Sequence, residues 1–126
     1  MRKVFLLLAV SLAVSAGVRS AENELSTDLM QNIEDTNKSL SSNIALNNKQ
    51  AASADAKELT QMFAEVEAFF EHKGDAANAV ELARQSKNLS SDIVGYVAAS
   101  NFASATTAAT TLSRTCRTCH TFYKKE

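Results

Sequence analysis

The segment ELTQMFAEVEAFF, residues 58–70, shows the clearest helical pattern in the chain. Its apolar residues recur every three or four positions, so they share one face of an α-helix. They are Leu59, Met62, Phe63, Val66, Phe69 and Phe70. A helix with one apolar face must bury that face against other elements, and the segment therefore predicts a packed helical domain.

The composition of the whole chain agrees with helices. Its 126 residues include no Pro and only 3 Gly, so the residues that form the tight turns of β-hairpins are scarce. A hydrophobic fraction of 45% and a net charge of -1 favour one folded domain over a disordered chain. The same charge balance excludes a strongly basic protein that binds nucleic acid, and 2 cysteines exclude a scaffold held by several disulfides.

The first 20 residues have the features of a secretory signal peptide. Two basic residues precede an apolar run over residues 4–18, which is shorter than the roughly 20 residues that span a bilayer. We expect cleavage after Ser20, with Ala16 and Ala21 as alternative sites; an uncleaved amphipathic anchor fits the flanking residues less well. The sequence therefore predicts an exported, periplasmic protein without stable membrane insertion, in which residues 21–126 form the folded domain.

Three further segments repeat the helical spacing and complete a pattern of four helices. The first helix is expected over residues 24–47. A polar break separates each of the first three helices from the next one. The second helix is expected to begin near Ser53 or Asp55, and Asp75 and Asn101 are the predicted N-caps of the third and fourth helices. Gly74 suits the left-handed position that ends the second helix. Four amphipathic segments with short links predict an all-α fold, an antiparallel up-down-up-down four-helix bundle.

The sequence RTCRTCHTFYK, residues 114–124, carries the most specific chemical pattern. Cys116 and Cys119 are three residues apart, so on a helix both thiols lie on one side, one turn apart. His120 follows directly. This Cys-x-x-Cys-His spacing is the attachment pattern of c-type haem, in which the thiols bind the two vinyl groups and the imidazole reaches the iron. We therefore expect one covalently bound haem c on Cys116 and Cys119, with His120 as an axial iron ligand.

Three other interpretations of these residues explain less. A structural zinc site normally takes four protein ligands, and the chain has only His72 as a further histidine and no further cysteine. A thioredoxin-like redox pair needs the strand-to-helix context of an α/β domain, which the helical pattern does not provide. A local disulfide between Cys116 and Cys119 suits an oxidising compartment but gives His120 no role.

The signal peptide, the four helices and the single Cys-x-x-Cys-His near the C-terminus resemble the class II c-type cytochromes. This is the four-helix-bundle family of cytochrome c′ and its low-spin, methionine-ligated relatives, whereas class I cytochromes carry the pattern near the N-terminus. Tyr123 and Lys124 continue the family's pattern with an aromatic and a basic residue, and the absence of proline departs from it. The resemblance covers the architecture of the mature chain, while its specific identity depends on the last dozen residues.

The resemblance implies that the first helix covers the haem face opposite His120. In the low-spin branch a methionine early in that helix completes the coordination, and Met30 matches that place; Leu29 is the alternative if the helix phase differs by one residue. A thioether ligand closes the site and implies a soluble carrier of single electrons between protein redox partners, not an enzyme. In the cytochrome c′ branch an apolar residue covers five-coordinate iron, which binds diatomic gases such as NO and CO. A peroxidase-like site would need a distal His–Arg pair, and the first helix has no arginine.

Several other residues of the sequence could serve either the packing of the bundle or the haem site. Met62 lies within the densest apolar face, so we expect it in the core, and His72 at a helix end is expected to be exposed. Basic residues near the C-terminus suit either haem propionates and an acidic redox partner or the dipole of the helix. They are Arg114, Arg117, Lys124 and Lys125.

Aromatic side chains suit either the wall of a haem site or the core. They are Phe63, Phe69, Phe70, Phe102, Phe122 and Tyr123. Relatives in the family often dimerise through their first two helices, and the pair Phe69 and Phe70 would suit such a surface. The sequence therefore leaves a homodimer open.

Overall fold

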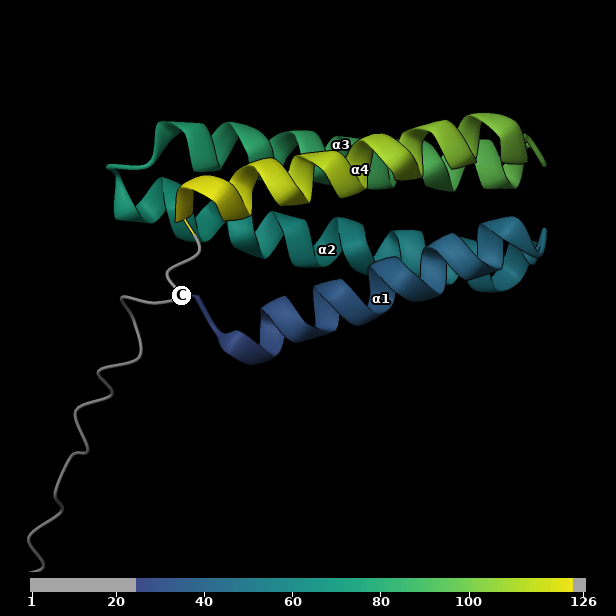
Figure 1. The fold of residues 1–126 in the computed structure, drawn as a ribbon, viewed down its shortest axis with the longest axis horizontal. Helices are drawn as coiled ribbons and strands as arrows, with labels where there is room; N and C mark the ends of the chain where they lie inside the picture. Colours follow the sequence, from purple (N-terminus) through teal and green to yellow (C-terminus); the bar gives the residue numbers. More distant parts are fainter. Residues whose placement is uncertain (1–24, 124–126) are drawn as a thin grey trace, which may run out of the picture.

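The computed structural model describes residues 25–123, and within them the chain forms four α-helices. Their bounds are α1 Thr27–Ala45, α2 Lys49–Lys73, α3 Ala77–Ala98 and α4 Phe102–Tyr123. Figure 1 shows them packed side by side, with short turns that reverse the chain after each helix. The predicted antiparallel four-helix bundle is confirmed. The expected signal peptide and its cleavage site lie outside the described residues, and none of the four helices combines the length and apolar content needed to cross a bilayer.

The apolar faces of the helices meet in one core. Each helix contributes a large side chain that is completely buried: Leu40, Leu59, Ile93 and Leu112. The face of α2 that the sequence predicts points inward, with Phe69 half-buried and the others buried. Much of the rest of the core is alanine, contributed by α2, α3 and α4. Such small side chains let packed helices approach closely.

The core face of α3 includes two serines that its apolar pattern does not reveal. Ser86 and Ser90 are buried, and their hydroxyls donate to the carbonyls four residues earlier at 2.9 and 2.8 Å. These bonds satisfy the hydroxyls inside the helix, so the buried polar groups carry little penalty. Tyr96, near the end of the same helix, is 37% exposed.

Two of the predicted helix ends are confirmed. The Oδ1 atom of Asn101 accepts a hydrogen bond from the backbone N–H of Ser104 at 3.1 Å, which caps α4. Gly74 ends α2 with a φ of 79°, a left-handed conformation that glycine adopts without steric cost.

Two predicted helix starts are wrong. The α2 helix begins at Lys49, before the predicted start, because the side chain of Asn48 accepts a hydrogen bond from the Ala51 N–H at 3.2 Å. The N-cap of α3 is Ala76, which makes no side-chain capping bond, so Asp75 does not cap that helix.

Asp55, one of the two expected starts of the second helix, lies inside α2 and attaches α1 to it. Its carboxylate accepts hydrogen bonds from the Ser39 hydroxyl and from the Asn43 amide, both at 2.8 Å. Hydrogen bonds to a charged acceptor are stronger than neutral ones. The C-terminal half of α1 is therefore fixed on α2 by polar contacts as well as by core packing.

The boundary between α1 and α4, called the α1–α4 seam below, is the least closely packed of the four contacts between neighbouring helices. Figure 1 shows α1 diverging from α4 toward the end of the bundle that holds the N-terminus of α1 and the C-terminus of α4. The Cys-x-x-Cys-His pattern and Met30 belong to this end. The fold thus brings the two parts of the expected site to its most open edge.

Glu67 joins α2 to α3 through a carboxylate that is only 7% exposed. It pairs with the Lys87 ammonium through Oε2, and its Oε1 accepts a hydrogen bond from the Arg84 Nε–H at 3.0 Å. These partners, Lys87 foremost, hold the pKa of the Glu67 carboxyl below its ordinary value. A lowered pKa means that the folded state favours the charged carboxylate, so this pair stabilises the fold while Glu67 is ionised.

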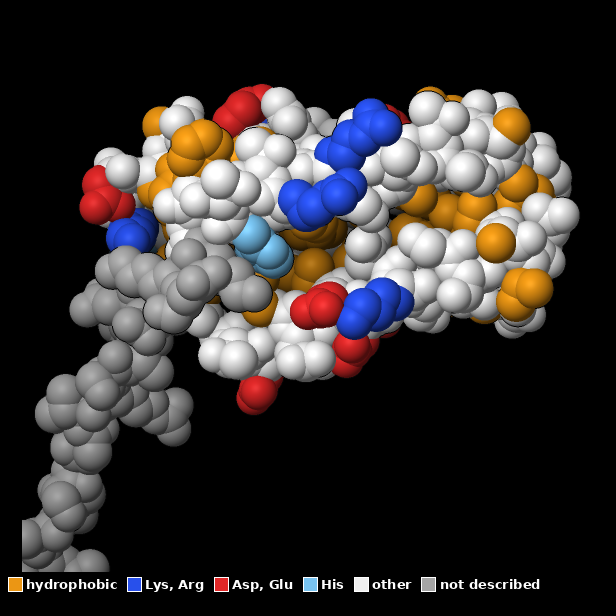
Figure 2. Space-filling view, viewed as in Figure 1, with side chains coloured by type: hydrophobic (Ala, Val, Ile, Leu, Met, Phe, Trp, Pro, Cys, Tyr) orange, Lys and Arg blue, Asp and Glu red, His pale blue; other side chains and the backbone are white. Residues whose placement is uncertain are grey.

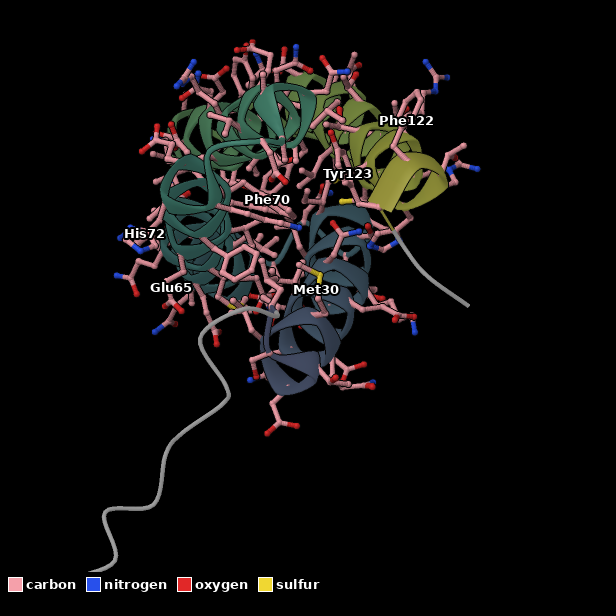
Figure 3. All side chains as sticks on the ribbon, turned by 90° about the vertical axis from the view of Figure 1, so that its left-hand side faces the viewer. Met30, Glu65, Phe70, His72, Phe122 and Tyr123 are labelled. Atoms are coloured by element: carbon pink, nitrogen blue, oxygen red, sulfur yellow. The ribbon has the colours of Figure 1, made fainter. Side chains whose placement is uncertain are left out.

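We expect the substitution Glu67→Gln to reduce the free energy of unfolding by about 1 kcal/mol near neutral pH, because two charge-assisted bonds become neutral ones. The wild-type contribution is complete above the ordinary glutamate pKa of 4.5 and is lost as the pH falls through the lowered folded-state value. Urea denaturation over this range should therefore show a flatter pH profile for the variant. Glu65→Gln is the matched control, since Glu65 is exposed and points away from the bundle (Figure 3); equal pH profiles for both variants would contradict the assignment.

Candidate functional site

The last two turns of α4 carry Cys116, Cys119 and His120. The helix continues to Tyr123 although many of its residues are β-branched threonines, because its apolar face packs in the core. The threonine hydroxyls are satisfied within the helix, since they donate to the carbonyls four residues earlier. These threonines are Thr106, Thr107, Thr110, Thr111, Thr115, Thr118 and Thr121. Regular helical spacing therefore extends through the whole Cys-x-x-Cys-His pattern.

The two cysteines are free thiols and both are half-buried. Burial raises the pKa of the Cys116 thiol to about 11, and the neighbouring Cys119 adds to the shift. Burial also raises the pKa of the Cys119 thiol. Both groups are thus held as neutral thiols near pH 7, whereas the reactive cysteine of a thioredoxin-like pair has a lowered pKa.

His120 is exposed in the last turn of α4. Each residue of an α-helix turns by about 100°, so His120 lies only about 40° around the helix from Cys116 and one turn beyond it. Ser113 lies on the same side, since it precedes His120 by two turns. Because Ser113 contacts α1, this side of α4 is the side that borders the α1–α4 seam.

A hydrogen bond from the Asn37 Nδ2 atom to the Ser113 Oγ atom, at 3.4 Å, aligns α1 with α4. The two helices run in opposite directions (Figure 1), so two turns toward the N-terminus of α1 correspond to two turns toward the C-terminus of α4. Two turns are about seven residues and about 10 Å along the helix axis. Met30 therefore lies two turns from Asn37 on α1, and His120 lies two turns from Ser113 on α4. The two residues are at the same level on opposite sides of the seam.

Met30 is half-buried and packs against the core. Figure 3 shows its side chain pointing from α1 toward the middle of the bundle. Leu29, the alternative residue of the same turn, is also half-buried against the core. Met62 is buried within the core and His72 is exposed in the last turn of α2, as the sequence predicts for both.

Three aromatic rings gather at this end of the bundle. The centroid of the Phe70 ring lies 5.6 Å from that of Tyr123 and 5.1 Å from that of Phe69, which it meets edge to face. Phe69 and Phe70 therefore pack into the bundle and do not form an exposed surface for a second subunit. Phe122 is 67% exposed and points outward (Figure 3), and Phe102 begins α4 at the opposite end.

Basic side chains border the seam on the α4 side. Figure 2 shows a hollow between α4 and α1 in which hydrophobic side chains are visible, with Lys and Arg side chains along its rim. Arg114 and Arg117 are exposed on α4, and within residues 25–123 neither forms an ion pair. Lys124 and Lys125, the other members of the predicted basic cluster, lie outside the described residues.

The chemistry of these side chains fits a covalently bound haem. Two reduced thiols lie one helical turn apart, an imidazole follows them, and a thioether lies level with the imidazole on the facing helix. Hydrophobic side chains are visible inside the hollow between α4 and α1 (Figure 2), and an apolar surface suits a porphyrin. Within the described part of the chain, no three His, Cys, Asp or Glu side chains are grouped so that they could hold a metal ion by themselves.

Asn37 and Ser113 are the residues of this site that the sequence did not reveal. Asn37 interrupts the apolar stripe of α1 between Ile33 and Leu40 at a half-buried position, and a polar residue within this stripe was the available signal. Ser113 gives no comparable signal, because small hydroxyl residues are frequent throughout α4.

Comparison with known proteins found no matching family model, no matching curated protein and no matching solved structure. The interpretation of the site therefore rests on the residues described above.

We expect the Cys116 thiol of the folded, haem-free chain to react slowly with iodoacetamide near pH 8 and faster as the pH approaches 11, since only the thiolate reacts. Peptide mass spectrometry after timed labelling measures the rate. The same chain unfolded in urea is the control and should react at the rate of an ordinary cysteine. Half-maximal reactivity of folded Cys116 near the usual value of 9.0 would contradict the effect of burial, and a value well below 9.0 would indicate an activated thiolate pair.

Proposed function

We propose that this chain is an exported class II c-type cytochrome that holds one covalent haem and carries single electrons between protein redox partners in the periplasm. The observation that supports the proposal most is the alignment of the Cys-x-x-Cys-His pattern of α4 with Met30 of α1 across the seam, given by the Asn37–Ser113 bond. The pattern alone suggests haem attachment. The thioether of Met30, on the facing helix, suggests that the haem transfers electrons.

Cys116 and Cys119 would form the covalent attachment. Each thiol adds across one vinyl double bond: the sulfur bonds to one vinyl carbon, the hydrogen goes to the other, and no group leaves. This addition needs reduced thiols and no oxidant, which agrees with two free, half-buried cysteines whose pKa values are raised. Once bound, the haem supplies an iron that alternates between the ferrous and ferric states.

His120 and Met30 would then ligate the iron from opposite helices. The imidazole is fixed near the iron because it follows the attached Cys119 directly, whereas Met30 arrives from a separate helix. A thioether stabilises ferrous iron and so raises the reduction potential. Together His120 and Met30 would leave no position open for a substrate, so a haem held by them would serve electron exchange alone.

The position of the site would also favour electron exchange with other proteins. The hollow of the seam is open on one face of the bundle (Figure 2), so an edge of the haem would lie near the surface. Arg114 and Arg117 border it with exposed positive charge. Figure 2 shows Asp and Glu side chains on the opposite, α1 side of the hollow, so the excess positive charge is confined to the α4 side. Positive charge there would steer an acidic redox partner toward α4.

The alternative proposal is a five-coordinate, cytochrome c′-like protein that binds NO or CO. The observation in its favour is that Leu29 is as near the core as Met30, so a small rotation of α1 would bring an apolar side chain over the iron. The same fold and the same attachment residues serve both proposals. They differ in whether Met30 binds the iron.

We expect the haem-loaded, mature wild-type chain to give a low-spin absorption spectrum that CO does not alter after reduction. Met30→Leu should give a high-spin spectrum that shifts with CO. The variant loses the methionine ligand of the iron, while the covalent bonds of Cys116 and Cys119 to the haem remain. Met62→Leu is the matched control, since it makes the same chemical change at a buried core position of α2. A wild-type chain that is already high-spin and binds CO would overturn Met30 ligation and support the gas-binding alternative.

A further inference from the structure

The outward side of α4 differs in composition from the outward sides of the other helices. Residues 102–123 include no lysine, aspartate or glutamate, and their two arginines are Arg114 and Arg117. The exposed sides of α1, α2 and α3 all carry charges of both signs. Scarce Lys, Asp and Glu together with Arg and aromatic residues is the composition that distinguishes the centre of a protein interface from the rest of a protein surface.

Five exposed residues in the C-terminal half of α4 are called the α4 face below. Arg114, Thr118 and Phe122 follow one another at intervals of four, so they lie along one ridge of the helix. Arg117 and Thr121 form the neighbouring ridge in the same way. From Arg114 to Phe122 the α4 face extends about 12 Å along the helix axis. Neither arginine forms an ion pair within residues 25–123, so both guanidinium groups are available to a partner.

The threonines of the α4 face can be covered without losing a hydrogen bond. The Thr118 hydroxyl donates to the Arg114 carbonyl at 3.0 Å, and the Thr121 hydroxyl donates to the Arg117 carbonyl at 2.9 Å. Covering a hydroxyl is costly when its hydrogen bond is lost, but these bonds lie within the helix. Removal of water from this part of the α4 face therefore costs little.

Phe122 is the large apolar side chain of the α4 face. It is 67% exposed and points outward (Figure 3), and its ring centroid lies 6.4 Å from that of Tyr123. Tyr123 in turn packs against Phe70, so the ring of Phe122 is supported from inside the bundle. Aromatic side chains that become buried on binding supply much of the binding energy of protein interfaces.

We propose that the α4 face is the docking surface for the redox partner, a protein whose acidic surface surrounds an apolar contact for Phe122. The inference rests on the proposed function. Carboxylates of the partner suit the two unpaired guanidinium groups, because a guanidinium binds a carboxylate through two parallel hydrogen bonds. Arg114 and Arg117 also border the hollow of the α1–α4 seam, so a partner on the α4 face would lie beside the proposed haem.

Two other occupants fit the α4 face less well. A second copy bound through the same face would be related by a two-fold axis, and on so short a face the arginines of both copies would lie close together and repel. A helix that binds a membrane inserts a continuous apolar side. The apolar side of α4 is instead in the core, and Phe122 is the one large apolar residue of the α4 face.

The first test places haem-loaded protein on gold electrodes with two thiolate monolayers, one ending in carboxylates and one in carboxylates mixed with methyl groups. Voltammetry at increasing protein concentration measures the affinity for each. Phe122→Ser should weaken binding to the mixed monolayer about fivefold or more and leave binding to the carboxylate monolayer unchanged. Leu46→Ser is the matched control, since Leu46 is 76% exposed at the opposite end of the bundle. Equal losses in both variants would overturn the proposal.

The second test removes the positive charge. The double variant Arg114→Gln and Arg117→Gln should bind both monolayers more weakly than the wild-type chain, and the difference should shrink as the salt concentration rises. Lys57→Gln combined with Lys73→Gln removes the same charge from exposed positions of α2 and should have much less effect. A loss as large in the α2 variant would show that total charge, and not the α4 face, determines binding.

The other occupants give different results. A dimer in sedimentation that Phe122→Ser dissociates would assign the α4 face to a second copy and overturn the acidic partner. Binding to vesicles of phosphatidylcholine and phosphatidylglycerol that Phe122→Ser abolishes would assign it to a membrane, with the same consequence. We expect neither result.

The docking surface and the proposed function fail in different ways. If the wild-type chain acquires no haem, the proposed function is wrong and the redox partner is overturned with it. If the wild-type chain holds haem and Phe122→Ser binds the mixed monolayer as tightly as Leu46→Ser does, only the docking surface is wrong.

Discussion

The packing of α1 along α4 decides which residues of the two helices face each other, and the hydrogen bond between Asn37 and Ser113 marks that alignment. The candidate site depends on it. The cysteines and His120 are close in sequence, so any helix would present them together. Met30 is about ninety residues away in sequence, and only the antiparallel pairing of the first and last helices brings it to the same level. A shift of α1 by one turn would bring a different residue opposite His120 and would remove the Met30 thioether from the proposed haem site.

The rest of the bundle divides into a firmly packed part and a more open edge. The α2 and α3 helices are joined by close packing and by the buried Glu67 with its two cations. The C-terminal half of α1 is attached to α2 through Asp55. Toward its N-terminus α1 diverges from α4 (Figure 1), and this is the end that carries Met30. A planar group between α1 and α4 would therefore enter where the fewest helix contacts have to be replaced.

The helices themselves could be predicted from the sequence because each follows from local spacing. The apolar face of residues 58–70 is inside, and Gly74 and Asn101 end and begin helices as their backbone chemistry predicts. The helix starts predicted near Asp55 and at Asp75 are wrong, since capping residues also occur inside helices and the sequence does not show what they contact. Asp55 bonds instead to the side chains of α1, a tertiary contact that has no local signal.

The same distinction applies to the candidate site. Cys116, Cys119 and His120 form a pattern that can be recognised from spacing alone, and the structure adds the burial that keeps both thiols neutral. The pairing of Asn37 with Ser113 joins distant segments and could not be predicted from either one. The burial of Phe70 against Tyr123 is of the same kind: the sequence left its ring between the core and a dimer surface, and the packing of α4 against α2 decides for the core.

The central claim of this account is that Cys116 and Cys119 bind a haem covalently. The most direct measurement is the intact mass of the chain after export in a bacterium that carries out c-type haem maturation, taken under denaturing conditions. The account predicts the mass of the processed chain increased by one haem, which denaturation does not remove. A processed chain without haem, with the two cysteines joined in a disulfide, would contradict it.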